Sequence, residues 1–208
     1  MRTSNPSPKD RSPRGRGRPR EFDVATVLDG AVRIFRERGY NATSIADLSL
    51  ATGLAAGSIY KAFKDKRGLF LAAFDRYVEE GDALRRLAFQ NGGNGRDKLK
   101  SLLGLYANAS SGAEGMRGCL VAGSTIELAT MDAATARQVK AAHARTEQLL
   151  VRTIREGQVD GSINAAIDSG ASAGLMLCIL QGMRVVGKTG RSRDDMNALV
   201  ELAMKILD

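Results

Sequence analysis

The sequence contains very little cysteine and histidine. Its 208 residues include two cysteines, Cys119 and Cys178, and one histidine, His143. Two cysteines do not make a disulfide framework, so we expect a reducing, cytoplasmic environment. One histidine without a cysteine or carboxylate cluster beside it provides neither a metal site nor a catalytic base with an orienting partner. We therefore predict a protein without a metal, a cofactor or an enzymatic activity.

Long apolar segments are also missing. No apolar run approaches the ~18 residues of a membrane span, so we expect no membrane partner. Residues 1–20 lack the apolar segment of a secretory signal. The chain is 43% hydrophobic, however, and is long enough to bury a sizeable core. These features together are typical of a globular protein.

Alternating β-branched residues are scarce, and helix-forming residues dominate the sequence. We therefore predict an all-α fold with about nine helices and no internal repeat. After the first three, we expect helices over residues 65–87, 96–110, 119–130, 132–156, 165–187 and 193–207. Glycine-rich stretches predict breaks at residues 91–95, 110–118 and 157–162.

Residues 22–70 carry the strongest pattern, which predicts three short helices. The first helix has an apolar face at three- and four-residue spacing, formed by Val24, Val27, Leu28, Ala31 and Phe35. It ends at Gly39, and Thr43 or Ser44 caps the second helix. Gly53 provides a tight turn before a third helix. Helix, glycine-containing turn and helix form a helix-turn-helix, whose second helix enters the major groove of DNA.

Side chains outside this predicted core suit a polyanion, because hydroxyls, ammonium groups and helix N-terminal amides bind phosphate oxygens. The predicted DNA contacts are Thr43, Ser44, Ala56, Gly57, Ser58, Tyr60, Lys61 and Lys66. The third helix lacks Arg, Asn and Gln, the usual readers of base edges. The alternative is a solvated surface on a generic helical hairpin.

This segment resembles the DNA-binding signature of the tetracycline-repressor-like (TetR) family of bacterial transcription regulators. The matching residues are Gly39, Tyr40, Thr43, Ser44, Ala51, Gly53, Leu54, Ser58, Ile59, Tyr60, Phe63 and Lys66. The resemblance implies a dimeric regulator of double-stranded DNA, most often a repressor, with a small-molecule cavity in its C-terminal bundle. Ala55 departs from the family, which commonly has a hydroxyl residue at this cap.

Residues 1–20 form an arginine-rich arm with a net charge of +6. Its composition predicts disorder, and Arg16, Arg18 and Arg20 alternate with glycine and proline. Such arms beside a helix-turn-helix reach into the minor groove, and the arm also resembles an AT-hook. The alternative is a solubilising tail. We therefore divide the chain into the arm, a DNA-binding domain at residues 21–66, and a ligand-binding and dimerisation domain at residues 67–208.

The last two predicted helices each carry an apolar stripe, which favours a four-helix interface with a second copy. The predicted interface residues are Leu175, Ile179, Met196, Leu199, Val200 and Ala203. The alternative is that both helices complete the core of the monomer.

The cavity that the resemblance implies gives a further set of candidates. The predicted lining is Tyr106, Met116, Cys119, Leu120, His143, Met176 and Met183. Ordinary core packing is the alternative for the methionines. Cys119 follows an arginine and a glycine, so it is either a small core residue or a sensor of oxidants or electrophiles.

Residues 182–189 match the phosphate-binding pattern G-x-x-x-x-G-K-[ST]. A P-loop needs a strand before it and a helix after it, whereas these residues end an apolar helix and Gly190 follows. We interpret the match as accidental, with a nucleotide-binding enzyme as the competing class. An architectural DNA-binding protein without an effector is a third possibility.

Overall fold

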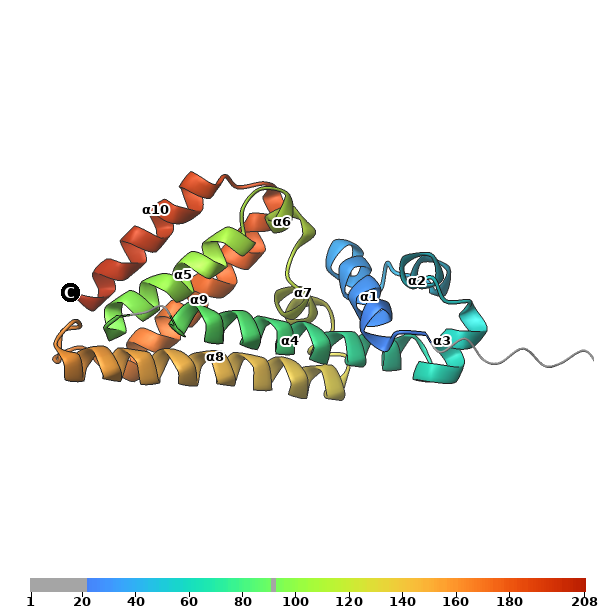
Figure 1. Ribbon diagram of the computed structural model, residues 1–208, viewed down its shortest axis with the longest axis horizontal. Coiled ribbons are helices and arrows are strands. Elements are labelled where there is room, and N and C mark those ends of the chain that lie inside the picture. The colour runs from blue at the N-terminus through green and yellow to red at the C-terminus, as the bar shows by residue number, and fades with distance from the viewer. Residues whose placement is uncertain (1–21, 91–92) are drawn as a thin grey trace, which may run out of the picture.

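The computed structural model describes residues 22–90 and 93–208, and every regular element in these ranges is helical (Figure 1). The predicted all-α class is therefore confirmed. The α-helices are α1 (Val24–Arg38), α2 (Ile45–Thr52), α3 (Ala56–Phe63), α4 (Lys66–Gln90), α5 (Gly95–Ala109), α6 (Gly112–Arg117), α7 (Leu120–Glu127), α8 (Ala133–Asp160), α9 (Ser169–Val186) and α10 (Arg193–Met204). Two 3-10 helices, η1 (Gly187–Thr189) and η2 (Lys205–Leu207), follow α9 and α10. The arm, with Arg16, Arg18 and Arg20, lies outside the described residues.

The helices form a small head and a larger bundle. In Figure 1, α1, α2 and α3 gather at one end, and the long helix α4 leads from them into the bundle. There α8 packs against α5 and α9, and α5 packs against α10. The short helices α6 and α7 lie where the bundle meets the head, and both contact α1. This junction is the part of the fold that positions the functional sites.

Local signals explain where the helices of the head begin and end. The carboxylate of Asp23 accepts hydrogen bonds from the amides of Ala25 and Thr26 at the start of α1. α1 ends at Gly39, whose φ of 81° is readily adopted only by glycine. α2 ends at Gly53, which has φ 71°. These ends agree with the sequence prediction.

Two of the predicted glycine breaks have a different structure. The sequence predicts a loop over residues 110–118, but the six residues Gly112–Arg117 form α6. It also predicts a helix end at Gly157, yet α8 continues past this residue to Asp160. A Cβ on Gly157 would lie 2.5 Å from Ile163 Cδ1, and one on Gly95 would lie 2.3 Å from the nitrogen of Gly157. These two glycines therefore allow a close helix crossing.

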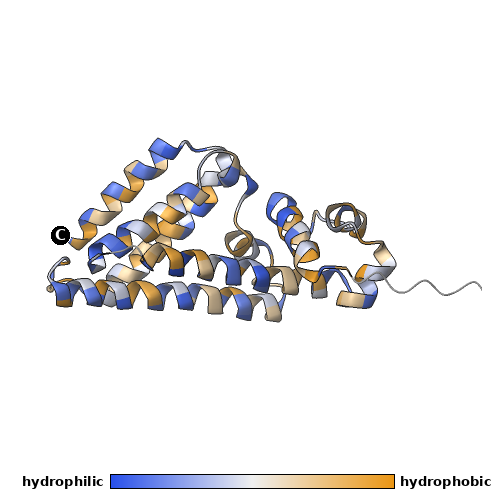
Figure 2. Cartoon of the chain, in the orientation of Figure 1, coloured by the Kyte–Doolittle hydropathy of each residue, from blue (hydrophilic) through white to orange (hydrophobic). Residues whose placement is uncertain are grey.

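The buried apolar side chains form two clusters. Figure 2 shows hydrophobic and hydrophilic residues alternating along the helices that contribute to them, such as α4, α8 and α10. One cluster fills the head and contains the fully buried rings of Phe35, Phe70 and Phe74, with Phe35 and Phe70 edge to face at 5.1 Å. This cluster extends beyond α3 into α4, α7 and α8. The other joins α5, α8, α9 and α10. The head therefore shares its core with three helices of the bundle, so a movement of those helices reaches it by direct packing.

Candidate DNA interface and effector cavity

Ser44 begins the helix-turn-helix by capping α2. Its Oγ accepts from the Asp47 amide at 3.1 Å, and the Asp47 carboxylate accepts from the Ser44 amide at 2.9 Å. This reciprocal pair is a capping box and fixes the start of α2. α3 lacks an equivalent cap, because Ala55 provides no side-chain hydrogen bond. The family commonly has a hydroxyl residue at this cap, and the structure shows that Ala55 leaves α3 without a side-chain cap.

The outer face of α3 carries several of the predicted DNA contacts. Ala56, Gly57, Tyr60 and Lys61 are exposed, and Ser58 is half-buried, whereas Ile59 is fully buried in the head. A Cβ on Gly57 would meet no atom within 4 Å, so the fold itself does not require glycine here. The exposed residues of this face are small, apart from the aromatic ring of Tyr60 and the ammonium group of Lys61.

Thr43 has an internal role instead of the predicted phosphate contact. Its side chain is 1% exposed, and its Oγ1 donates to the carbonyl of Gly39 at 2.6 Å. A buried, satisfied hydroxyl cannot reach DNA without unfolding the loop. We therefore remove Thr43 from the set of DNA contacts.

Lys66 is also held by the protein. Its Nζ donates to the carbonyls of Tyr40 and Thr43 at 2.8 Å each and lies 4.2 Å from the centre of the Tyr40 ring. The ammonium group joins the start of α4 to the loop before α2. Lys66 therefore positions the helix-turn-helix, which differs from the predicted phosphate contact.

Polar contacts among the described residues connect the head to the bundle. The Glu127 carboxylate accepts from the amides of Tyr40 and Asn41 at 3.0 and 2.6 Å. Arg36 of α1 forms an ion pair with Glu114 at 2.5 Å and donates to the carbonyl of Gly118. Lys188 Nζ donates two hydrogen bonds of 3.4 Å to the carbonyls of Arg36 and Glu37, and Arg76 of α4 pairs with Asp29 of α1 at 3.1 Å. Within the bundle, the Arg67–Asp132 ion pair at 2.6 Å joins the start of α4 to the start of α8.

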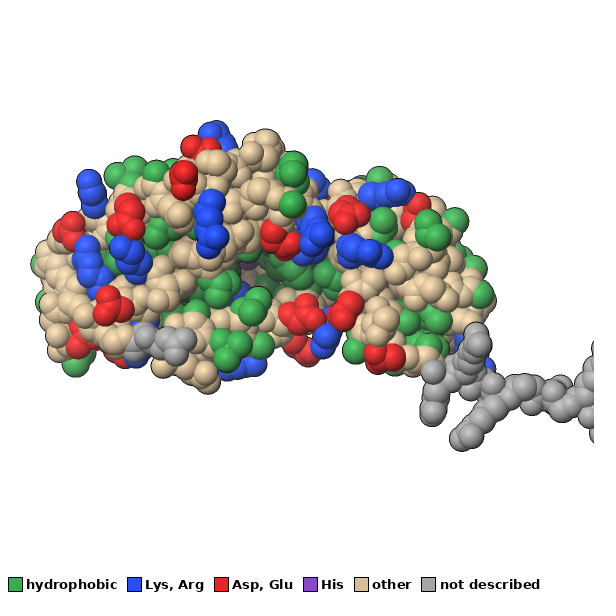
Figure 3. All heavy atoms as spheres, turned by 45° about the horizontal axis from the view of Figure 1, so that its top comes forward, with side chains coloured by type: hydrophobic (Ala, Val, Ile, Leu, Met, Phe, Trp, Pro, Cys, Tyr) green, Lys and Arg blue, Asp and Glu red, His purple; other side chains and the backbone are tan. Residues whose placement is uncertain are grey.

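A cavity of about 290 Å³ lies beside these links. The surface is visibly hollowed between the head and the bundle, with hydrophobic side chains in the hollow (Figure 3). Three of the residues that the sequence suggests for an effector site, Tyr106, Cys119 and His143, line this cavity. They come from α5, from the residue before α7, and from α8, so the fold brings together side chains that are distant in sequence.

The other four predicted cavity residues lie elsewhere. Met116 is exposed, and Met176 and Met183 are buried in the core of the bundle. Leu120 is buried in the head cluster and lines a neighbouring cavity of about 240 Å³. Helical spacing alone could not separate core methionines from lining ones, because both occupy the inner faces of helices.

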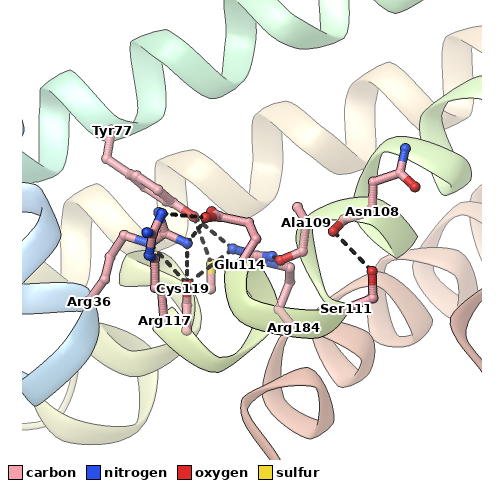
Figure 4. Close-up of polar contacts among 10 residues, drawn as sticks. Arg36, Tyr77, Asn108, Ala109, Ser111, Glu114, Arg117, Cys119 and Arg184 are labelled. Carbon is pink, nitrogen blue, oxygen red and sulfur yellow. Dashed lines mark hydrogen bonds and ion pairs between the residues drawn. The ribbon is translucent and has the colours of Figure 1, made fainter. Parts of the chain in front are cut away.

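A cluster of polar side chains, Tyr77, Cys119 and Arg184, lines the 290 Å³ cavity. Figure 4 shows its polar contacts. Arg184 is 5% exposed and donates to the hydroxyl of Tyr77 at 3.1 Å, to the carbonyl of Gly118 at 3.2 Å, and to the carbonyl of Ala109. The Tyr77 hydroxyl donates to the Cys119 sulfur at 3.5 Å. Arg184 therefore joins carbonyls at the ends of α5 and α6 to the Tyr77–Cys119 pair.

The cluster changes the acidity of its members. Burial raises the pKa of Tyr77, and the neighbouring Cys119 adds to this effect. Burial also opposes the charged form of Cys119, but the guanidinium of Arg184 and hydrogen bonds from Ala122 and Tyr77 bring the pKa of the thiol below its ordinary value. The Arg184 guanidinium therefore favours the charged form of Cys119.

Sequence reasoning missed Gln181 and Arg184, which both line the cavity from α9. A signal for them exists in the sequence, since two polar residues three positions apart interrupt an otherwise apolar helix. Such residues mark a polar stripe on one helix face.

The P-loop-like residues do not form a phosphate loop. Gly182 to Val186 lie within α9, and the last three residues form η1. A Cβ on Gly187 would lie 2.2 Å from the carbonyl oxygen of Ser110, so this glycine allows a close backbone contact. Lys188 binds the end of α1, as described above.

The predicted interface residues divide between core and surface. Met196, Val200 and Ala203 are buried in the bundle core, and Ile179 packs partly against it. Leu175 is 50% exposed and Leu199 is 41% exposed. The structure adds further exposed neighbours on the same faces: Cys178, Gly182, Val185 and Leu202. These exposed residues with Leu175 and Leu199 form what we call the α9–α10 stripe.

The segment Ser169–Thr189 contradicts the expectation that no apolar segment is long enough to cross a membrane. By length and composition it passes that test, and 33% of its most apolar stretch is buried within the described structure. The exposed part of its apolar surface includes the α9 residues of the α9–α10 stripe.

The fold and the exposed α3 face define a DNA-binding regulator of the helix-turn-helix class. The family profile described as "Bacterial regulatory proteins, tetR family" matches residues 27–73, and the profile "Tetracyclin repressor-like, C-terminal domain" matches residues 95–202. The chain therefore belongs to the TetR family of transcription regulators, which are not enzymes.

Individual relatives are similar over nearly the whole chain. The HTH-type transcriptional repressor ComR of Escherichia coli is 30% identical over 93% of this chain and 92% of its own. The uncharacterised HTH-type transcriptional regulator YezE of Bacillus subtilis is 27% identical over 92% of this chain and 100% of its own. A cysteine mutant of the TetR-family regulator CifR, solved in complex with 26-base-pair operator DNA, is 29% identical, with a TM-score of 0.82 over 92% of this chain and 100% of its own.

Proposed function

We propose that this regulator is a ligand-responsive repressor that binds a pseudo-palindromic operator as a homodimer in the cytoplasm. The observation that carries the proposal is the exposed face of α3, with Tyr60 and Lys61 beside a row of small residues, on a head built as a helix-turn-helix. The solved CifR complex with operator DNA supports the same use of this head.

We divide the proposed DNA contacts into two groups. Ala56, Gly57 and Ser58 meet base edges or allow close approach of the duplex, while Tyr60, Lys61 and the exposed cap Ser44 meet the DNA backbone. The arginines of the arm add minor-groove contacts in this proposal. Because α3 has few side chains for direct readout, DNA shape and half-site spacing carry much of the specificity.

A selection of binding sites from random duplexes tests this function. We expect recovered sequences with two inverted half-sites. A single base change within a half-site should cost about 1 kcal/mol, the low end of the usual range. Changing the half-site spacing by two base pairs should cost more. Recovery of a single half-site, or of no consensus above competitor DNA, would contradict the proposal and favour an architectural DNA-binding protein.

We further propose that the α9–α10 stripe joins two copies. Exposed apolar residues at spacings of three and four on α9 form an apolar surface, and removing this surface from water is energetically favourable. A second copy covers this surface in a two-fold four-helix arrangement. Coverage by a second copy also explains why so apolar a helix is only partly buried within one chain.

Sedimentation of stripe variants tests the dimer. Leu175→Glu and Leu202→Glu introduce charges into the stripe and should give monomers. Val159→Glu is the matched control, because Val159 is 90% exposed on α8, outside the stripe. If the stripe variants sediment like the control, the interface is not here. If the wild-type protein partitions into detergent or vesicles, a membrane contact replaces the dimer.

The cavity is the proposed effector site. Arg36 and Glu114 both line it and also link α1 to α6, so a ligand there acts on groups that hold the head. An effector that binds one arrangement of these links better than the other shifts the spacing of the two heads.

A further inference from the structure

The cavity has a polar wall on α8 and α9, and the rest of its lining is mainly apolar. His143 and Thr146 of α8 and Gln181 and Arg184 of α9 form the polar wall. The remaining lining side chains, which we call the apolar wall, are mainly apolar and include Val32, Val78, Leu84, Leu105, Tyr106 and Val121. The charged residues Arg36, Glu80, Arg85 and Glu114 also line the cavity. A ligand that fits both walls has a flat or compact apolar body and a polar group at one edge.

Two atoms of the polar wall have unused hydrogen-bonding capacity. The Oε1 of Gln181 and the Nε2 of His143 are buried, and neither has a hydrogen-bond partner among the described residues. The other two polar residues of this wall are engaged, since Thr146 Oγ1 donates to the carbonyl of Ala142 and Arg184 binds Tyr77 and two carbonyls. Buried polar atoms are rarely left without partners, so these two indicate where a ligand is recognised.

The chemistry of these atoms restricts the ligand. An amide oxygen only accepts hydrogen bonds, so its partner must carry a donor. An imidazole nitrogen donates or accepts according to its tautomer. A hydroxyl group satisfies both, because it donates one hydrogen and accepts others. The cavity volume of about 290 Å³ is at the low end of ligand sites, which suits one ring or two fused rings.

We propose that the effector class of this cavity is a compact aromatic or alicyclic alcohol, with phenols as the simplest case. The hydroxyl group donates to Gln181 and pairs with His143, and the ring packs against the apolar wall. This inference rests on the proposed effector site and deepens it, because it names the chemistry of the ligand.

Two matched pairs of probes test the proposal by calorimetry on the full chain without DNA. They are p-cresol against 4-methylanisole, and 2-naphthol against 2-methoxynaphthalene. Each methyl ether keeps the ring and the oxygen but has no donor. We expect at least one phenol to bind about fivefold or more tightly than its ether, the effect of losing about 1 kcal/mol of hydrogen bonding.

The Gln181→Leu variant provides the decisive control. Because it removes a buried acceptor without a partner, we expect an unchanged or higher melting temperature and a loss of the preference for the phenol. Gln148→Leu, at an exposed position of α8, should change neither. Equal affinities within both pairs, no binding of any probe, or a lower melting temperature for Gln181→Leu would overturn the proposal. Operator selection without a ligand tests the proposed repressor function separately.

Discussion

Replacement of Lys66 by methionine tests whether this lysine positions the head or contacts DNA. Methionine keeps most of the apolar stem but removes the ammonium group that bridges the carbonyls of Tyr40 and Thr43. Lys61→Met is the matched variant, because Lys61 lies exposed on the outer face of α3. Both variants lose one positive charge from the same small domain.

The structure predicts different losses of folding stability for the two variants. Lys66→Met loses two charge-assisted hydrogen bonds and a cation–π contact, and its position is only half-buried, so we expect a cost of about 2–3 kcal/mol in the free energy of unfolding. For a chain of this size, that lowers the melting temperature by roughly 4–12 °C. Lys61→Met should change the free energy of unfolding by less than about 0.5 kcal/mol.

The assay combines thermal unfolding with salt-dependent binding to a random-sequence duplex. Lys61→Met should reduce the slope of log affinity against log salt by about 0.9, because one counterion fewer is released. Lys66→Met should leave that slope nearly unchanged at temperatures where the variant is folded. If Lys66→Met reduces the slope by about 0.9 and keeps the wild-type melting temperature, Lys66 contacts phosphate and its positioning role is refuted.

Three further predictions follow from the packing and the pKa shifts. In thermal unfolding, Gly95→Ala should destabilise the protein by about 2 kcal/mol or more, because the new Cβ would lie 2.3 Å from the Gly157 nitrogen. Gly104→Ala is the control: its Cβ would meet no atom within 4 Å, so it should be neutral or stabilising. The hydrogen bond from Arg67 lowers the pKa of Asp132, so the Arg67–Asp132 pair stabilises the fold above the unfolded pKa of the carboxyl and loses this effect as pH falls below about 4. In Asp132→Asn, the free energy of unfolding should therefore depend less on pH in the acid range. An unchanged pH dependence would argue against the pair. In a Cys178→Ser background, the rate of Cys119 modification by iodoacetamide should rise with pH around a midpoint below that of an ordinary thiol, and Arg184→Met should raise this midpoint pH. A midpoint pH that does not change in Arg184→Met would show that Arg184 does not lower the pKa of the thiol.

The sequence determined the parts of this protein that depend on nearest neighbours along the chain. Gly39 and Gly53 have positive φ and end α1 and α2, and Ser44 caps α2, all within a few residues of the signals that predict them. The apolar face of α1 is likewise a local periodicity. For these reasons the helix-turn-helix, the all-α class and the family could be predicted from the amino-acid sequence alone.

Only the tertiary structure decided which polar groups face outward. Thr43 and Lys66 match a DNA-binding signature, yet their side chains bind carbonyls of the protein, including one 26 positions away in sequence. The junction between Arg36 and Glu114 joins residues 78 positions apart. No short-range pattern encodes such pairs, because they depend on how α6 packs against α1.

The same limit applies to the cavity and to the proposed interface. A stripe of apolar residues on α10 shows that the helix has an inner face, but burial of Met196 and Val200 with exposure of Leu202 depends on how far α10 is rotated against α5. Gln181 and His143 lie on separate helices and line one cavity only because α8 and α9 pack side by side. Periodicity sets the face of each helix, whereas packing between helices decides what each face meets.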